Sequence, residues 1–341
     1  MLDMGATIIV GGFFGDEGKG KITSYLTLND DLAACVRAGV GPNAGHTIMH
    51  LGKTIKTRLI PSGFVDKETK LLIGPGVLID VEVLLKEIKD IQVSDRLIID
   101  QQCGIIEKKH IESDKRGALK NKISTTGTGT GPANADRALR KIKLAKDVNE
   151  LSMFIGDVPA KLGKLISNNQ NIVIEGTQGM YISLYHGEYP YVTSKDVTAS
   201  AACSDVGIGP KNVDEIIIVF KSYVTRVGAG PLENELSQEE TKKKGWLEFG
   251  TVTGRQRRAA PFNFELAKKA CLINSATQIA LTKLDILYPQ IAGINNFSKL
   301  DNQSKQFIEK IENETGVPVT LIGTGANETH IIDRRKILKI K

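Results

Sequence analysis

Short apolar runs alternate with polar, glycine-rich segments along the first half of the chain. Strands are predicted at residues 6–10, 33–37, 56–60, 71–73, 97–100 and 172–174, where the runs are brief and rich in β-branched residues. Helices are predicted between them, at 18–28, 81–91, 136–140 and 148–167. Strands that alternate with helices are typical of an α/β fold built on a parallel sheet.

The second half continues the alternation. Further strands are predicted at 216–220, 225–228, 278–281 and 317–322, with helices at 264–274 and 304–315. Ser237 and Glu240 form a capping box that predicts the start of a short helix, which ends at Gly245. No internal repeat and no long linker interrupts the pattern, so we expect one domain over residues 1–341.

Composition narrows the class of protein. The chain has 341 residues, of which 41% are hydrophobic and 25% charged, values typical of a globular protein. The net charge of +6 is compatible with nucleic-acid binding, but aromatic residues make up only 5% and the basic residues are interleaved with acidic ones. Small anionic molecules are therefore the expected partners, and no nucleic-acid partner is expected.

The cysteines and the apolar segments predict the compartment. The four cysteines are widely spaced and form no C-x-x-C pair, which fits buried free thiols in a reducing cytosol: Cys35, Cys103, Cys203 and Cys271. The apolar run near the N-terminus is too short for a signal peptide, and no segment is long enough to cross a bilayer. We expect a cytoplasmic protein with no membrane partner.

Residues 11–21 form a glycine-rich stretch between the first predicted strand and the first predicted helix. A loop in this position directs backbone N–H groups and a helix N-terminus toward one point, which suits a phosphate. The phosphate-loop pattern G-x-x-x-x-G-K-[ST] is matched by Gly15, Gly20 and Lys21 but fails at Ile22, which lacks the hydroxyl that holds magnesium. The stretch is therefore not an ordinary phosphate loop.

Two carboxylates, Asp16 and Glu17, stand at the crown of this loop. A carboxylate is unfavourable beside a polyanion unless it holds a metal ion or removes a proton. Taken alone, the motif fits a glycine-rich turn with a solvated acidic tip equally well.

Other glycine-rich segments follow predicted strands, at residues 39–47 and 175–179. Because the carboxyl ends of parallel strands meet at one edge of a sheet, these segments are expected to form one site. The threonine- and glycine-rich segment 124–132 offers hydroxyl and amide donors that would suit a phosphate; a mobile lid or a linker explains it equally well.

Two further segments suggest anion and base recognition. Arg255, Arg257 and Arg258 cluster on a loop and could bind a dianion through bidentate pairs, although a solvated basic turn is the simpler interpretation of the cluster alone. In the segment 282–285, the Asp285 carboxylate could accept from N1–H and the 2-amino group of guanine. A four-residue match is weak evidence by itself.

Taken together, the segments resemble adenylosuccinate synthetase. The matching motifs, in order, are GDEGKGK (15–21), NAGHT (43–47), STTGTGTGP (124–132), EGTQG (175–179), YPYVTS (189–194), TRVGAGP (225–231), EFGTVTGRQRR (248–258) and TKLD (282–285). Eight motifs in the same order, spread over most of the chain, make chance resemblance untenable.

The resemblance implies a single large α/β domain around a mostly parallel central sheet, similar to P-loop NTPases, with peripheral helices and small antiparallel elements. It implies the GTP-dependent ligation of IMP and L-aspartate to adenylosuccinate, with release of GDP and phosphate, through a 6-phosphoryl-IMP intermediate. This is the first committed step of AMP synthesis. Asp16 matches the base and His46 the acid, and Mg²⁺ would contact Asp16 and the backbone carbonyl of Gly45.

The resemblance also implies binding positions. For IMP they are Asp16, Asn43, Thr126, Arg140, Gln178, Thr193 and Arg255; for aspartate Thr253, Arg255 and Arg257; for GTP Gly15, Glu17, Gly18, Lys19, Gly20, Lys21, Gly45, His46, Thr47, Lys283, Asp285, Thr324 and Gly325. Arg140 matches an arginine that reaches the IMP phosphate of the neighbouring subunit, which implies a homodimer with shared sites.

The chain departs from the family pattern at a few positions. Phe13 and Phe14 stand where Gln-Trp is usual, and Thr128 replaces an arginine in the threonine-rich loop. The chain is also shorter than the familiar bacterial and eukaryotic members. A function from another class, a GTP-binding switch, is permitted by the incomplete phosphate loop and by the TKLD segment, but the missing hydroxyl at Ile22 and the IMP- and aspartate-type motifs argue against it.

Overall fold

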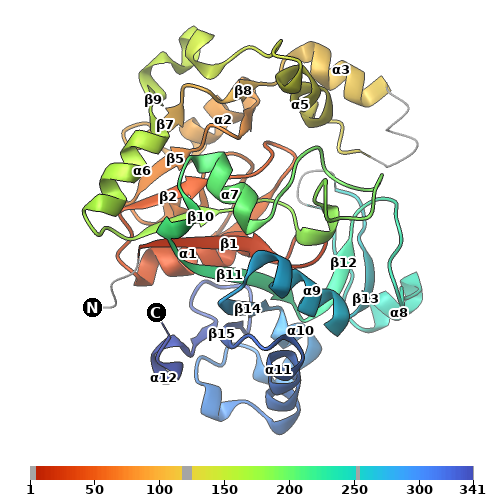
Figure 1. Cartoon of the computed structure of the whole chain (residues 1–341). Helices are drawn as coiled ribbons and strands as arrows, with labels where there is room; N and C mark the ends of the chain where they lie inside the picture. The colour runs from red at the N-terminus through yellow and green to blue at the C-terminus, as the bar shows by residue number, and fades with distance from the viewer. Residues whose placement is uncertain (1–4, 117–124, 251–253, 341) are drawn as a thin grey trace.

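The computed structural model describes residues 5–116, 125–250 and 254–340. Its centre is a ten-stranded sheet in the order β16-β15-β14-β11-β1-β10-β2-β5-β7-β9 (Figure 1). The pairings between neighbouring strands are parallel, except that β16 (Ile331–Asp333) runs antiparallel to β15 (Val319–Gly323). The prediction of an α/β fold around a mostly parallel sheet is therefore confirmed.

The other elements surround this sheet. Its remaining strands are β1 (Ala6–Gly11), β2 (Ala34–Arg37), β5 (Lys70–Ile73), β7 (Leu97–Asp100), β9 (Ile155–Gly156), β10 (Ile172–Glu175), β11 (Val213–Lys221) and β14 (Gln278–Thr282). Small two-stranded sheets pair β3 (His46–His50) with β4 (Lys53–Thr57), β6 (Leu78–Ile79) with β8 (Gly104–Ile105), and β12 (Tyr223–Arg226) with β13 (Arg258–Pro261).

In the described residues, α-helices lie between these strands along the chain, and one more follows the last strand. They are α1 (Lys19–Asn29), α2 (Val81–Ile91), α3 (Lys108–Arg116), α5 (Thr130–Ala138), α6 (Val158–Ser167), α7 (Ala199–Val206), α8 (Gln238–Lys243), α9 (Phe264–Asn274), α10 (Leu284–Leu287), α11 (Asn302–Thr315) and α12 (Arg335–Leu338). In the described part of the chain, no helix is long and apolar enough to span a membrane.

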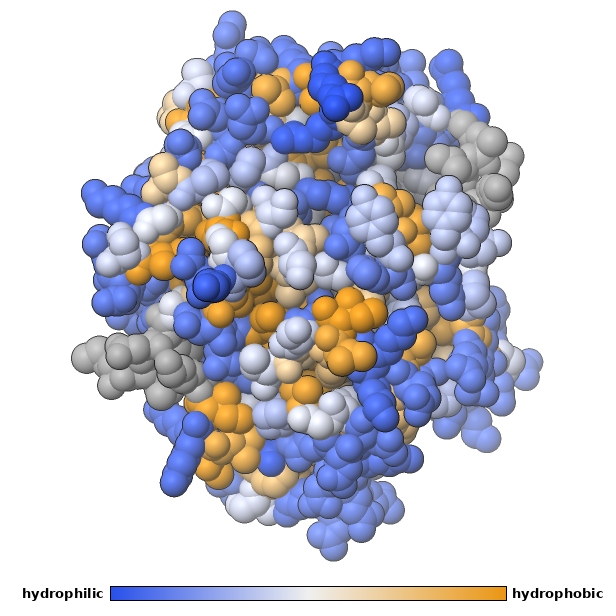
Figure 2. All heavy atoms as spheres, in the orientation of Figure 1, coloured by the Kyte–Doolittle hydropathy of each residue, from blue (hydrophilic) through white to orange (hydrophobic). Residues whose placement is uncertain are grey.

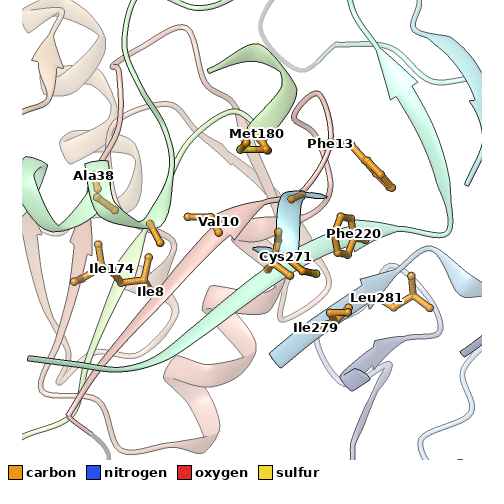
Figure 3. Packing of buried hydrophobic residues seen from close by; sticks show 14 of the residues in the cluster. Ile8, Val10, Phe13, Ala38, Ile174, Met180, Phe220, Cys271, Ile279 and Leu281 are labelled. Atoms are coloured by element: carbon orange, nitrogen blue, oxygen red, sulfur yellow. The ribbon is translucent and has the colours of Figure 1, made fainter. Parts of the chain in front are cut away.

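Side chains of β1 divide the core into two layers. Ile8 and Val10 point to the face covered by α6, α7, α9 and α11, whereas Ile9 points to the face covered by α1 and α2. Figure 3 shows Ile8 and Val10 along one strand, with Phe13 lying beside Phe220 at the end of the same layer. Because helices cover both faces of the sheet, the side chains of β1 are buried on both sides. The sequence of β1 is therefore continuously apolar instead of alternating. On the face that Figure 2 shows, hydrophilic residues predominate and apolar patches lie between them.

Several element predictions agree with the structure, including the helices at 81–91 and 264–274 and the strand at 97–100. The capping box of Ser237 and Glu240 is present at the start of α8. The four cysteines are buried free thiols, also as predicted.

The helix predicted at 148–167 ends at Ser167 as predicted, but the prediction is wrong for the residues before Val158. The chain forms a 3₁₀ helix at Asn149–Phe154, then the short strand β9, and begins α6 only at Val158. Pro159 explains the late start, because a proline fits the first turn of a helix but not its interior. The Asp157 carboxylate caps this first turn by accepting from the N–H of Ala160 at 2.9 Å.

The predicted strand at 56–60 is displaced. Residues 53–57 pair with His46–His50 as a hairpin, so the second glycine cluster runs directly into a strand. Beyond Thr57, the N–H groups of Leu59 and Ile60 donate to the Glu87 carboxylate, both at 3.0 Å, instead of to a neighbouring strand. The sequence around residues 56–60 gives no sign that a carboxylate from a distant helix accepts hydrogen bonds from these N–H groups.

The helix predicted at 136–140 begins earlier, at Thr130. Gly129 precedes it in a left-handed conformation, with φ +81°. The N–H of Gly129 donates to the buried Asp114 carboxylate at 2.9 Å, which anchors the end of the threonine-rich loop to α3.

Candidate active site

The glycine-rich loops converge on one cavity of about 860 Å³. It lies at the carboxyl ends of β1, β2, β10 and β14, where the sequence placed a common site. The expected site residues in its wall are Gly15, Asp16, Glu17, Gly18, Lys19, Gly20, Lys21, Asn43, Gly45, His46, Thr47, Thr126, Gln178, Thr193, Arg257, Lys283, Asp285 and Gly325.

The conformation of the loop after β1 is stabilised by Glu17, one of its two acidic residues. Glu17 is almost fully buried and turns inward: one carboxylate oxygen accepts from the N–H groups of Phe13 and Gly15, at 3.1 and 2.7 Å. Its other oxygen binds the Lys19 ammonium at 3.0 Å, and that ammonium also donates to the Gln178 carbonyl. Glu17 therefore shapes the loop, whereas the Asp16 side chain remains at the cavity.

The N-terminus of α1 opens into the cavity. Gly18 is the N-cap, in a left-handed conformation with φ +95°, and it has no side chain that could accept from the first-turn N–H groups. These donors and the positive end of the helix dipole face the space lined by residues 18–21, which makes it a favourable place for an anion.

His46 lies in a buried polar cluster at the end of β10. Its Nδ1 is 2.6 Å from the Glu175 carboxylate, which also pairs with Arg37 at 3.0 Å. The N–H and hydroxyl of Ser62 donate to the same carboxylate, at 2.9 and 2.5 Å. Glu175 thus contacts four donor groups from three residues and fixes the orientation of the imidazole ring.

Burial and the charges of this cluster together set its protonation. Burial and the neighbouring Arg37 guanidinium lower the pKa of His46 to about 4, despite the opposing effect of Glu175. Burial would raise the pKa of Glu175, but the charges of His46 and Arg37 outweigh it and lower that pKa to about 2. In the ligand-free protein at neutral pH, the imidazole is therefore neutral and the carboxylate ionised.

Elsewhere in the cavity wall, the Arg257 guanidinium connects two carboxylates. Its Nη2 lies 2.9 Å from Oδ2 of Asp16, and its Nη1 pairs with Glu248. Asp16 itself has a left-handed backbone, with φ +65°, which places its side chain at the crown of the loop. An expected proton acceptor and an expected substrate-binding cation are thus in direct contact.

The segment after β14 forms a further part of the cavity wall. Thr282 donates from its hydroxyl to the Glu17 carbonyl at 2.5 Å, so this segment is joined to the loop after β1. Lys21 donates to the carbonyls of Gly325 and His330, at 2.5 and 3.0 Å. Burial lowers the pKa of Lys21 to about 8, although the Asp285 carboxylate opposes this shift.

Several polar atoms in the wall are buried without a protein partner. Within the described residues these include Oδ1 of Asn43, Oε1 of Gln178 and Oδ1 of Asp285. Buried acceptors without partners are uncommon, and each calls for an explanation such as a bound ligand. All three belong to residues expected to contact IMP or guanine.

The structure places other expected residues outside this wall. Arg140 is exposed beyond the end of α5, with φ +61°. Thr324 is buried behind the cavity, where its hydroxyl donates to the Ile294 carbonyl, and Arg255 donates to the Thr125 carbonyl at 2.6 Å. Thr253 lies outside the described residues.

Comparison with known proteins decides the family. A sequence model of adenylosuccinate synthetase matches residues 8–150 and 141–290. The chain is 55% identical over 336 residues to the adenylosuccinate synthetase of Methanocaldococcus jannaschii, covering 97% of each chain. The chain belongs to the adenylosuccinate synthetase family. It is also 53% identical to the Archaeoglobus fulgidus adenylosuccinate synthetase, over 98% of this chain and 99% of that one.

Solved structures agree with this assignment. The fully ligated adenylosuccinate synthetase of Plasmodium falciparum matches 96% of this chain and 99% of its own, with a TM-score of 0.89 at 26% identity. The succinoaminodeoxyadenylate synthetase of cyanophage S-2L shares the fold, with a TM-score of 0.79 at 24% identity over 97% of this chain and 95% of that one. Membership of the adenylosuccinate synthetase family makes the chain a ligase of purine nucleotide synthesis.

Sequence reasoning missed several residues that build the site, among them Arg37, Glu175, Lys221 and Glu248. The sequence contains a signal for each of them, because Arg37 and Lys221 end apolar strands and Glu175 and Glu248 are the first residues of recognised motifs. The departure at Phe13 and Phe14 is accommodated by other aromatic residues: Phe13 packs on Phe220 and Phe262, and Phe14 on Tyr181 and the guanidinium of Arg226.

The low pKa of His46 predicts a pH dependence of stability. The unfolded chain binds a proton near the ordinary value of 6.5, whereas the folded protein does so only near pH 4. Stability from this group is therefore complete above about pH 6.5 and is lost as the pH falls toward 4. The free energy of unfolding, measured with urea, should fall between pH 7 and pH 5 in the wild type. In His46→Asn this fall should be smaller by about 1–2 kcal/mol.

His186→Asn, at an exposed site, is the matched control and should keep the wild-type pH dependence. An identical loss of stability in His46→Asn and in the wild type would contradict the predicted pKa.

Proposed function

We propose that this chain ligates IMP and L-aspartate to adenylosuccinate at the expense of GTP. The observation that carries the proposal is the set of unpartnered buried acceptors on Asn43, Gln178 and Asp285, which line one cavity together with Asp16 and His46. Guanine offers N–H donors at N1 and at its 2-amino group, and the ribose of a nucleotide offers hydroxyl donors, so bound nucleotides would supply partners for acceptors of this kind. Residues 1–341 would act as one domain around this cavity.

In the first step, Asp16 would accept the N1 proton of IMP. The O6 oxygen then becomes a nucleophile and attacks the γ-phosphorus of GTP, and the bond from that phosphorus to the bridging oxygen breaks, which leaves GDP and 6-phosphoryl-IMP. In the second step, the aspartate amine attacks C6 and forms a C–N bond. The C6–O6 bond breaks, phosphate leaves carrying O6, and the amine loses a proton. Positioning of the reacting atoms and electrostatic stabilisation supply the rate enhancement.

His46 would donate to the phosphoryl oxygens of GTP. Glu175 accepts best from a proton on Nδ1, so Nε2 becomes a donor when the ring is protonated. The ring is neutral in the ligand-free protein because of its low pKa. A polyphosphate beside it favours the charged imidazole and raises that pKa, so the acid forms once the nucleotide has bound.

The residues present fit a magnesium ion held mainly by substrate. Mg²⁺ in phosphoryl-transfer sites uses one or two protein oxygens together with phosphate oxygens. Asp16 would supply a carboxylate oxygen and Gly45 its carbonyl, beside the anion-binding N-terminus of α1. When bound, the ion would neutralise charge on the transferred phosphoryl group. The inward position of Glu17 supports this small protein donor set.

The binding positions that the resemblance implies for IMP, aspartate and GTP are proposed here with the same roles. Arg255 and Arg257 would bind the carboxylates of aspartate with Thr253, and Lys283 and Asp285 would read guanine. Arg140 is exposed and outside the cavity, which supports a role at the IMP site of a neighbouring subunit in a homodimer. We also assign the chain to the cytoplasm, where its substrates are made.

The direct test is to incubate the protein with IMP, GTP, aspartate and Mg²⁺ and to measure adenylosuccinate by chromatography. Product is expected only when all of the substrates are present. Folded protein that forms no adenylosuccinate would refute the proposal, and steady GTP hydrolysis without IMP would favour a GTP-binding switch instead.

Replacement of the proposed base should uncouple binding from chemistry. Asp16→Asn keeps the size of the side chain but cannot accept the N1 proton, so kcat should fall by at least about 100-fold. IMP binding measured by calorimetry should change little. Asp31→Asn, at another left-handed aspartate outside the cavity, is the matched control and should keep full activity. Equal loss of binding and turnover in Asp16→Asn would make Asp16 structural.

The guanine assignment predicts a change in nucleotide preference. Asp285→Asn replaces a charged acceptor by an amide, and hydrogen bonds to charged groups contribute about 1.5–3 kcal/mol. The ratio of kcat/KM for GTP to that for ATP should fall by about 10- to 100-fold, while the KM values for IMP and aspartate stay near those of the wild type. An unchanged ratio would place guanine recognition elsewhere.

A further inference from the structure

Glu248 is the centre of a buried cluster of charges beside the cavity. One carboxylate oxygen lies 2.9 Å from the Lys221 ammonium and also pairs with Arg257. The other accepts from the Tyr223 hydroxyl at 2.5 Å and is 3.8 Å from the Lys283 ammonium. Three cations and a phenol from separate segments thus share one carboxylate.

These neighbours keep Glu248 ionised despite its burial. Its side chain is only 12% exposed, and that of Lys221 only 2%. Burial would raise the pKa of Glu248, but the charges of Lys221 and Arg257 outweigh it and lower that pKa to about 2. A buried carboxylate with this many partners is held rigidly, because any movement would leave a buried charge without a partner.

Arg257 is held by Glu248 through both its backbone and its side chain. Its N–H donates to the Glu248 carbonyl at 2.8 Å, and Nη1 pairs with the Glu248 carboxylate, while Nη2 reaches Asp16. Its Nε is buried and has no hydrogen-bond acceptor in the described protein. A fixed guanidinium with an unused donor at the cavity wall is prepared for another anionic group.

We propose that Glu248 is a positioning residue that orients the Arg257 guanidinium for the carboxylate of the incoming amino acid. Glu248 acts through Arg257 and does not contact substrate itself. The inference rests on the proposed function, in which Arg257 binds aspartate. Tyr223 in turn fixes Glu248, and its ring is stacked on Trp246 with centroids 4.5 Å apart, so the support extends into the β12–β13 sheet.

The neighbouring arginine offers a natural comparison. Arg258 also pairs with a glutamate, Glu235, through Nε and Nη2, but these side chains are 31% and 36% exposed. Neither residue lines the cavity. The Glu235–Arg258 pair therefore has similar chemistry without access to the site.

The experiment measures KM for each substrate in Glu248→Gln. Loss of the charge frees Arg257 to change rotamer, so KM for aspartate should rise at least 10-fold, while KM for IMP changes less than about 2-fold. Glu235→Gln is the matched control and should retain wild-type KM values. A folded Glu248→Gln protein with wild-type KM for aspartate would overturn the inference, as would an equal rise in KM for IMP.

A milder variant covers the case in which Glu248→Gln does not fold. Tyr223→Phe removes one hydrogen bond to Glu248 but keeps the buried ring, and it should raise KM for aspartate by about 2- to 5-fold. Tyr25→Phe, which removes the hydroxyl that contacts Asp333, is its control. Unchanged KM for aspartate in a folded Tyr223→Phe protein would count against the inference. Wild-type protein that makes no adenylosuccinate would instead refute the proposed function.

Discussion

The buried ion pair between Arg37 and Glu175 is the interaction on which the site depends. The two residues are direct partners in the register of the adjacent parallel strands β2 and β10, and both side chains are nearly inaccessible to solvent. Burial of an ion pair is favourable only if its remaining polar atoms are satisfied. Here His46, Ser62 and the Arg58 carbonyl supply the additional partners. Every loop that provides one of these partners is thereby fixed relative to the ends of the strands.

Parallel topology explains why residues so distant in sequence meet. Each strand delivers its following loop to the same edge, and short hydrogen bonds then join the loops to one another. Lys19 contacts the Gln178 carbonyl, and Thr282 contacts the Glu17 carbonyl, so the loops after β1, β10 and β14 form one connected surface. The cavity is consequently a property of the sheet edge and not of any single motif.

Much of the fold could be predicted from the sequence because its signals are local. The apolar run of β1, the amphipathic pattern of α2 and the capping box at Ser237 each depend on residues close together in the chain. The late start of α6 has a local cause in Pro159, but the displaced strand at 56–60 arose where a distant group decides the local structure. The Glu87 carboxylate, from α2, captures the N–H groups after Thr57 and ends the strand earlier than its composition indicates.

The residues of the site also divide into those that local sequence patterns predict and those that only the fold brings together. Motif positions such as Asp16, Asn43 and Asp285 could be named from the sequence, and the structure brings them to one cavity. The positions of their neighbours could not be predicted, because the partners of Glu175 and Glu248 come from strands and loops far apart in the chain. The protonation of His46 follows from that packing and from no pattern around residue 46.

The amine of Lys21 illustrates how the parts of the site are joined. Lys21 lies in the first turn of α1, yet its amine donates to the carbonyls of Gly325 and His330, near the C-terminus of the chain. His50 and Glu328 add a second connection, at 2.7 Å, from the β3–β4 hairpin to the same segment. If the proposed assignments hold, the walls for the guanine base and for the triphosphate belong to one hydrogen-bonded frame, so binding at one wall would be coupled to binding at the other.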